Sequence, residues 1–229
     1  MYRSQWLSMS LALLIASLTQ LSGLSRAATN GDVTKIEIIA DDMCCKGCAQ
    51  KVAAQLYAAP GVMSVEADVP NRKIVVTAKP SPKLTVDRLW KAVEQGKGGP
   101  SKLTTSEATY VLTPQDKLEP QKRLPAGRYS LVIRELRNEE TAQTIANQLY
   151  KVRGVEKVSV DITNNTLFLQ PSHNSLLSPW ILATVVKQAG SEPLAIGGPH
   201  GMLTIEWTTT KDAATATRLP YPQLQGEIR

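Results

Sequence analysis

A pattern that occurs twice in the chain, 93 residues apart, limits its possible folds more than any other feature of the sequence. Gln55-Leu56-Tyr57 and Gly61-Val62 are separated by three residues, and so are Gln148-Leu149-Tyr150 and Gly154-Val155. Self-similarity at a fixed spacing indicates that one folding unit is present twice. A chain of 229 residues has room for two such units of about 80 residues each.

The first copy shows the periodicity of four strands and two helices. Alternating apolar and polar residues mark the strands, and apolar residues at helical spacing mark the helices. In chain order, these segments are a strand over 33–40, a helix over 48–57, strands over 62–69 and 73–78, a helix over 85–95, and a last short strand between residues 102 and 113. Pro60-Gly61 ends the first helix and a glycine-rich run, 96–100, ends the second. This order, βαββαβ, predicts an α+β domain over residues 33–113.

The second copy, over residues 128–207, keeps the apolar positions of the first and loses its cysteines. Cys45 corresponds to Asn138 and Cys48 to Thr141. Because Asn is a favoured N-cap, Asn138 predicts the start of a helix. The second helix of this copy, over 180–188, is expected to be displaced by an insertion or deletion of about one residue. The apolar pairs are Val52 and Ile145, Val65 and Val158, and Val76 and Leu169.

Three segments lie outside the two copies. Residues 114–127 are polar and contain prolines, which predicts a linker, and residues 208–229 predict a flexible tail. Residues 1–28 have the pattern of a signal peptide, with Arg3, an apolar run and small residues near its end. The apolar run is shorter than the roughly 20 residues that span a bilayer, so we expect a periplasmic or secreted protein. The alternative is an uncleaved segment that anchors the protein to a membrane.

All three cysteines of the chain lie in the run Cys44-Cys45-Lys46-Gly47-Cys48, between a predicted strand and a predicted helix. Disulfides are common in exported proteins, but these cysteines have no distant partner, which excludes a structural disulfide framework. Thiolates are soft ligands that suit Cu(I), Zn(II), Cd(II) or Hg(II). The positive end of the helix dipole should favour the thiolate of Cys48. The cluster therefore predicts a soft-metal site held by Cys45 and Cys48.

Two thiolates leave a bound ion incompletely coordinated. Structural zinc takes four ligands, so a two-thiolate site suits an ion that is handed to the thiols of a partner. Cys44 is a candidate third ligand; alternatively, its side chain points away, as neighbouring side chains of an extended segment do. The Cys45 and Cys48 thiols are also compatible with a redox-active disulfide.

The residues Met43-Cys44-Cys45-Lys46-Gly47-Cys48 fit the pattern Met-x-Cys-x-x-Cys inside a βαββαβ order. In motif, element order and length, residues 33–112 resemble the heavy-metal-associated domain family. This family includes copper chaperones, the N-terminal domains of metal-transporting P-type ATPases and periplasmic mercury-binding proteins. Residues 128–207 resemble it more weakly. The resemblance implies two tandem ferredoxin-like βαββαβ sandwiches after the signal peptide, of which the second is a degenerate repeat.

The resemblance also implies roles for individual residues. The cysteines at the positions of Cys45 and Cys48 bind the metal in this family. The residue at the position of Met43 packs inward and supports the loop. A basic residue after the second helix neutralises the metal–thiolate loop in some copper chaperones, and Lys97 stands in the matching place.

Two positions depart from the family pattern. Asp42 stands where glycine is usual, and Cys44 stands where Thr, His or Asp is usual. Together with Asp41, Asp42 makes the mouth of the loop more acidic than in a typical copper chaperone. These departures leave the choice of metal open.

We therefore expect an exported metal-binding protein, not an enzyme, that buffers or transfers one soft ion. Cu(I) is favoured, Zn(II), Cd(II) or Hg(II) are alternatives, and a metal transporter or another metal-binding protein is the expected partner. A thiol-disulfide oxidoreductase is the first alternative function, and a scaffold that binds a protein through the second copy is another. The net charge of +6 is spread without a long basic run, which gives a nucleic-acid role little support. His173 and His200 have no ligand-spaced partner and are expected on the surface.

Overall fold

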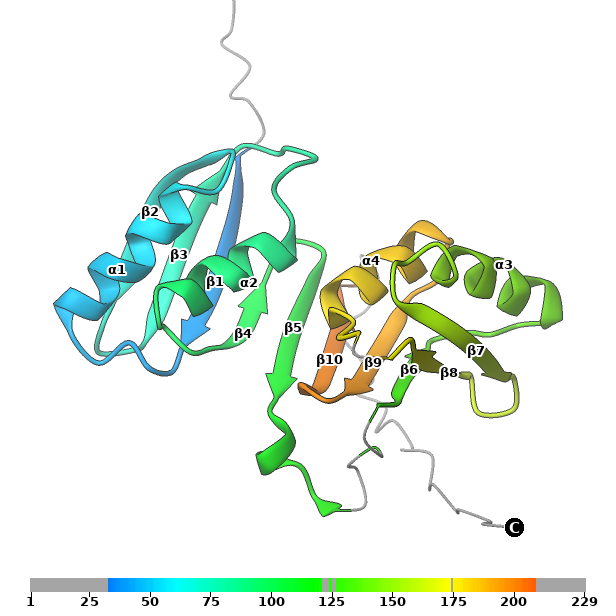
Figure 1. The fold of residues 1–229 in the computed structure, drawn as a ribbon. Helices are drawn as coiled ribbons and strands as arrows, with labels where there is room; N and C mark the ends of the chain where they lie inside the picture. The colour runs from blue at the N-terminus through cyan, green and yellow to red at the C-terminus, as the bar shows by residue number, and fades with distance from the viewer. Residues whose placement is uncertain (1–32, 121–123, 125–126, 174, 209–229) are drawn as a thin grey trace, which may run out of the picture. The chain divides into compact units, whose positions relative to one another are not determined.

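The computed structural model describes residues 33–120, 124, 127–173 and 175–208 (Figure 1). The predicted signal peptide over 1–28 lies outside the described residues, as do residues 209–229 of the predicted tail. None of the described helices is long and apolar enough to cross a membrane.

The first half of the described chain has a ferredoxin-like α+β fold. Its strands have the order β2-β3-β1-β4, and every neighbouring pair is antiparallel. Helices α1 and α2 pack side by side against these strands (Figure 1). The elements of this fold are β1 (Thr34–Ala40), α1 (Lys46–Tyr57), β2 (Val62–Asp68), β3 (Lys73–Ala78), α2 (Val86–Gln95) and β4 (Pro100–Thr104).

The core of this half lies between the helices and the sheet. Alternation along β1 and β3 turns every second side chain toward the helices, where it is almost completely buried. Burial of these apolar side chains is the main contribution that holds the helices on the sheet. The largest members of the buried set on the sheet and helices are Ile36, Ile38, Ile74, Val76 and Leu103 from the strands and Val52, Leu56, Leu89, Trp90 and Val93 from the helices.

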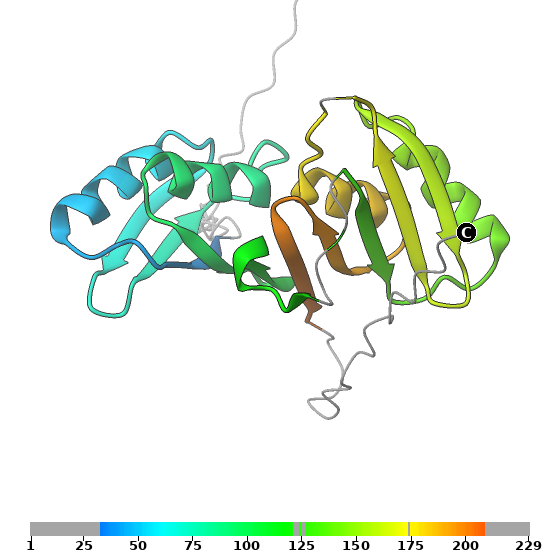
Figure 2. The ribbon, with the colours of Figure 1, turned by 60° about the horizontal axis from the view of Figure 1, so that its bottom comes forward.

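The second half repeats these elements with an offset of 93 residues and no insertion or deletion. Its strands have the order β7-β8-β6-β9, and α3 and α4 lie on one side of them (Figure 2). The expected one-residue shift in the second helix is wrong, because Pro179, a favoured first residue, begins α4 93 residues after Val86 begins α2. The elements are β6 (Tyr129–Ile133), α3 (Glu139–Leu149), β7 (Val155–Asp161), β8 (Thr166–Pro171), α4 (Pro179–Gln188) and β9 (Pro193–Gly198).

The segment expected to hold one last strand holds two, β4 and β5 (Ala108–Thr113). A tight turn joins them, and the Thr105 hydroxyl oxygen accepts hydrogen bonds from the backbone N–H groups of Glu107 and Ala108. The side chain of Thr105 thus stabilises a turn that contains no glycine or proline. Because these usual turn residues are absent, the sequence did not indicate a break between the two strands. The second half has a matching extra strand, β10 (Gly201–Trp207).

These two extra strands join the halves into one ten-stranded antiparallel sheet. Strand β5 pairs with β10, from Ala108 opposite Trp207 to Thr113 opposite Met202. The helix layers also touch, with the rings of Trp90 and Trp180 4.5 Å apart between centroids. The short 3-10 helix η1 (Gln115–Lys117) lies in the segment predicted as a linker.

Candidate metal centre

The three cysteines lie at the start of α1, where the chain leaves β1. Cys45 is the N-cap of the helix, and its sulfur accepts a hydrogen bond from the backbone N–H of Cys48 at 3.3 Å. No acidic residue lies in the first turn of α1, so the positive end of the helix dipole is not offset there. The cap therefore directs the sulfur of Cys45 toward the helix axis and next to that of Cys48.

All three sulfurs meet in one small cluster. The Sγ atoms of Cys45 and Cys48 are 2.9 Å apart, and those of Cys44 and Cys48 are 3.7 Å apart. All three lie within 4.8 Å of one another. Cys44 and Cys45 are exposed, and Cys48 is half-buried against the core. The cysteines are free thiols in this arrangement and are open to a metal ion or to a partner.

The residues before the cysteines are anchored to the body of the domain. Met43 is completely buried in the core, as expected from the family resemblance. The backbone N–H groups of Asp41 and Asp42 donate to the carbonyl oxygens of Gly99 and Gly98, at 2.8 and 2.9 Å. The loop after α2 therefore holds the strand-to-helix loop in place.

Gly99 shows how closely these two loops approach each other. Its backbone is in the left-handed region, with φ of 59°, and a Cβ atom there would overlap the side chain of Asp42. A side chain at this position would thus be strained by the backbone conformation and would collide with Asp42. Sequence reasoning missed this contact because the two glycines were assigned only to the end of α2.

The pKa values of the two closest thiols move in opposite directions. The hydrogen bond from the Cys48 thiol lowers the pKa of Cys45, and the backbone N–H of Cys48 adds to the effect. The same hydrogen bond, together with one that Cys48 donates to Cys44, raises the pKa of Cys48. The thiolate is thus favoured at Cys45 and not, as expected from the sequence, at Cys48, because Cys48 donates the hydrogen bond between them.

Lys97 follows α2 in a left-handed backbone conformation, with φ of 58°. It precedes Gly98, whose carbonyl holds Asp42, so its backbone is close to the cysteine loop. Its side chain is exposed and lines a shallow groove of about 390 Å³ between α1 and α2. The groove is lined by Lys51, Ala54, Gln55, Gln95, Gly96 and Lys97.

The matching loop of the second half has the same helix start without sulfur. The side chain of Asn138 caps α3 and accepts a hydrogen bond from the backbone N–H of Thr141 at 2.8 Å, which confirms the predicted cap. Leu136 is buried in the position of Met43. Arg137, in the position of Cys44, forms an ion pair with Glu135 at 2.6 Å. This loop offers no soft ligand.

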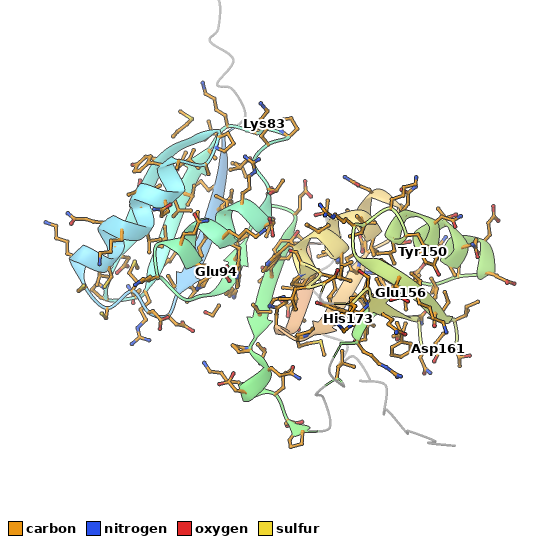
Figure 3. All side chains as sticks on the ribbon, in the orientation of Figure 1. Lys83, Glu94, Tyr150, Glu156, Asp161 and His173 are labelled. Carbon is orange, nitrogen blue, oxygen red and sulfur yellow. The ribbon has the colours of Figure 1, made fainter. Side chains whose placement is uncertain are left out.

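The two histidines lie on the surface, as expected. His200 is exposed between β9 and β10. His173, labelled in Figure 3, is exposed after β8. His173 lines a cavity of about 560 Å³ with Tyr129, Ser172 and Ser175. In the described part of the chain, the three cysteines are the one group of three or more possible metal-ligating side chains that converge.

Comparison with protein families assigns the segment that holds this cluster. The model of the heavy-metal-associated domain matches residues 37–99, from β1 to the loop after α2. Residues 37–99 are a heavy-metal-associated domain. The match includes the three cysteines, Met43 and Lys97, and it ends before β4. The second half lies outside the matched residues.

Solved structures of similar fold include the N-terminal domain of PacS from Synechocystis PCC6803, at 24% identity over 30% of this chain and 94% of that chain, with a TM-score of 0.26. Oxidized MerP from Ralstonia metallidurans CH34 is 24% identical over 33% of this chain and 99% of that chain, with a TM-score of 0.28. The N-terminal soluble domains of CopA from Bacillus subtilis are 15% identical over 80% of this chain and 99% of that chain, with a TM-score of 0.31. The comparison with curated proteins gave no significant match.

Proposed function

We propose that this protein is an exported carrier that buffers or transfers one soft metal ion through the Met-x-Cys-x-x-Cys loop. The observation that carries the proposal is the convergence of Cys45 and Cys48, with sulfurs 2.9 Å apart, at the exposed helix start of a heavy-metal-associated domain. Soft ions bind thiolate in preference to carboxylate or water. The site residues are Cys45 and Cys48, with Met43 as the buried support of the loop and Lys97 as a nearby positive charge.

The exposure of the site favours transfer over permanent storage. A structural zinc site closes four ligands around the ion, whereas here the cysteines lie at the surface with open space on one side. The thiols of a partner can bind an ion held in this way before Cys45 and Cys48 release it. The partner we propose is a metal transporter or another metal-binding protein. Cu(I) is our first choice of ion, followed by Zn(II), Cd(II) and Hg(II).

The second half serves in this proposal as a sandwich of the same ferredoxin-like type that has lost its site. It has the strand order of the first half, and its loop has Arg137, Asn138 and Thr141 in place of the three cysteines. The domain boundaries we propose are 33–113 and 128–207, linked by 114–127. Strand β5, which follows the first sandwich, pairs with β10, which follows the second.

Export is proposed from residues 1–28, whose pattern is that of a cleaved signal peptide. A periplasmic or secreted location follows if the segment is removed. Mass spectrometry of the protein made from its full sequence tests this directly. The expected mature chain begins near residue 28 and is found outside the cytoplasm. A full-length chain in the membrane fraction would show an uncleaved anchor instead.

Metal reconstitution tests the central part of the proposal. Protein kept reduced without added thiols is titrated with Cu(I), and bound metal is counted per chain. We expect one ion per chain, and we expect Cys45→Ser with Cys48→Ser to abolish binding. The matched control is Asn138→Ser with Thr141→Ser, which changes the same two positions of the second half and should leave binding intact. Unchanged stoichiometry in the cysteine variant would contradict the proposal.

A thiol-disulfide oxidoreductase is the second candidate function, because Cys45 and Cys48 are free, close together and differ in the direction of their pKa shifts. A lowered pKa makes a thiol a better attacking group. Reduction of insulin separates the two functions. The carrier should show only background rates in this assay, with or without bound metal, whereas rates like those of thioredoxin would favour the oxidoreductase.

A further inference from the structure

The geometry points to Cys44 as a third sulfur ligand, so that the loop holds one soft ion in trigonal coordination. This inference rests on the proposed function and specifies its site. A Cys-x-x-Cys pair needs only Cys45 and Cys48, and Cys44 is an additional thiol placed just before them. The question is whether the fold turns this thiol toward the ion or away from it.

The distances between the sulfurs show that the thiol of Cys44 is turned toward the other two. With metal–sulfur bonds of about 2.3 Å, a trigonal ion requires sulfurs about 4.0 Å apart, and a linear two-coordinate ion requires about 4.6 Å. The sulfurs of Cys44 and Cys48 are 3.7 Å apart, close to the trigonal value. Those of Cys45 and Cys48 must separate from 2.9 Å in either case. Three sulfurs within 4.8 Å of one another therefore need only small side-chain movements to surround one ion.

The backbone explains why Cys44 faces the site. An extended segment would place Cys44 and Cys45 on opposite faces, but the chain turns sharply here. The backbone N–H of Met43 donates to the carbonyl of Ala40, and that of Cys44 donates to the carbonyl of Asp42, both at 3.0 Å. Because Met43 is buried inward, the turn presents Cys44 outward at the mouth where Cys48 emerges.

The second half supplies an independent view of the same backbone. Arg137 and Thr141, which correspond to Cys44 and Cys48, line one shallow cavity of about 390 Å³. Neither residue has sulfur, so attraction between thiols is not the reason that these two positions line the same cavity. The shared placement follows from the turn and helix start that both halves have. The backbone of this turn and helix start therefore places Cys44 next to Cys48.

A third thiolate changes the charge and the reactivity of the loaded site. Binding Cu(I) to three thiols releases three protons and leaves a net charge of −2 on the ion and its ligands, against −1 with two thiols. Lys46, the first residue of α1, and the helix dipole contribute positive charge at this helix start, which offsets part of the negative charge. A trigonal ion also has fewer free positions for an incoming thiol, so Cys44 should hold the ion more tightly and slow its release.

X-ray absorption at the copper edge tests the assignment. Full-length protein, kept anaerobic without added thiols, is loaded with one equivalent of Cu(I) and compared with Cys44→Ser. We expect three sulfurs around copper in the unchanged protein and two, at shorter distance, in Cys44→Ser. Proton release on binding at neutral pH should fall by up to one per ion in the variant. Circular dichroism checks that the variant is folded, and Arg137→Ser is the matched control in the second half.

The possible outcomes separate this inference from the function on which it rests. Two sulfurs in both proteins would overturn the role of Cys44 and leave the carrier function standing. Three sulfurs in both proteins would also overturn it, because the third ligand would then come from elsewhere, such as a second chain. Native mass spectrometry at the same loading detects such bridged dimers. Copper without sulfur ligands in the unchanged protein would remove both the inference and the proposed function.

Discussion

The two halves of this chain differ far more in their helix-start loops than in their folds. Strand pairings in both halves repeat at an offset of 93 residues, as Ile36 opposite Val76 and Tyr129 opposite Leu169 show. In the loops, the first half presents Cys45 where the second presents Asn138, and each residue caps its helix. The comparison indicates that the fold needs a capping side chain at this position, and that an oxygen or a sulfur atom can serve as the cap.

The two loops also differ in the charged side chains at their helix starts. The first turn of α3 carries Glu139 and Glu140, which offset the helix dipole, whereas the first turn of α1 has no acid. Arg137 is engaged by Glu135, and Arg134 by Glu192. The second loop thus has its arginines paired and acids in its first helical turn, whereas the first loop has free thiols at a helix start without an acid in its first turn.

The largest expected effect is the gain of a second metal site in the second half. Asn138→Cys with Thr141→Cys places thiols at the positions of Cys45 and Cys48 on the same backbone. We expect bound Cu(I) to rise from one to two ions per chain, measured by elemental analysis after removal of excess metal. A folded variant that still binds one ion would show that the two loops differ in more than their ligands.

Truncation of the buried residue beneath each loop should have the next largest effect. Met43 and Leu136 are both almost completely buried, so Met43→Ala and Leu136→Ala should each lower the free energy of unfolding by about 2 to 5 kcal/mol. Urea denaturation measures the loss. Only Met43→Ala should also weaken metal binding, because only Met43 supports the thiol loop. Equal weakening of metal binding by both variants would contradict the separation of the loops.

Removal of each N-cap should have a smaller and unequal effect. Asn138→Ala removes a hydrogen bond of 2.8 Å to the backbone N–H of Thr141 and should cost about 1 kcal/mol of stability. Cys45→Ala in the metal-free protein should cost less, because sulfur is a weak acceptor and its hydrogen bond is 3.3 Å long. Thermal unfolding of the two variants side by side measures both losses of stability. A larger loss for Cys45→Ala than for Asn138→Ala would contradict this prediction.

The smallest effect is a pH dependence that both halves should share. Asp68 and Asp161, each at a turn between strands, accept hydrogen bonds from the side chain and backbone of Asn71 and Asn164 (Figure 3 for Asp161). These bonds, led by that from the Asn side chain, lower the pKa of both carboxyls below the ordinary 3.8.

A lowered pKa means that this stabilisation is present above the unfolded value and is lost as pH falls through the folded value. The Tm difference between the unchanged protein and Asp68→Ala or Asp161→Ala should therefore be constant near neutral pH. Below about pH 3.8 it should shrink, and to a similar extent for both variants. A Tm difference that grows on acidification would mean that the sign of these pKa shifts is wrong.

Much of the first half could be predicted from periodicity and the repeat, because its elements are amphipathic and end at Pro or Gly. Strand β5 was not separated from β4, since the turn between them depends on the side chain of Thr105. The pairing of β5 with β10 joins residues that are about 90 to 100 positions apart, so it leaves no local sequence signal.

The candidate site was predictable in part. The spacing of Cys45 and Cys48 placed both at one helix start, and the inward position of Met43 followed from the family resemblance. The direction of Cys44 was not predictable from an extended-chain rule, because hydrogen bonds at Met43 and Cys44 turn the backbone. The hold of Gly98 and Gly99 on Asp42 and Asp41 also depends on tertiary contact.

The most direct test of the account is a residue-resolved NMR titration of the reduced, metal-free protein with one equivalent of Cu(I). We expect backbone amide shifts to change at residues 41–51 and 97–99, around the three thiols, while the matching residues 134–144 keep their shifts. Changes centred on 134–144, or spread equally over both loops, would contradict the claim that one of two equivalent loops alone carries the ion.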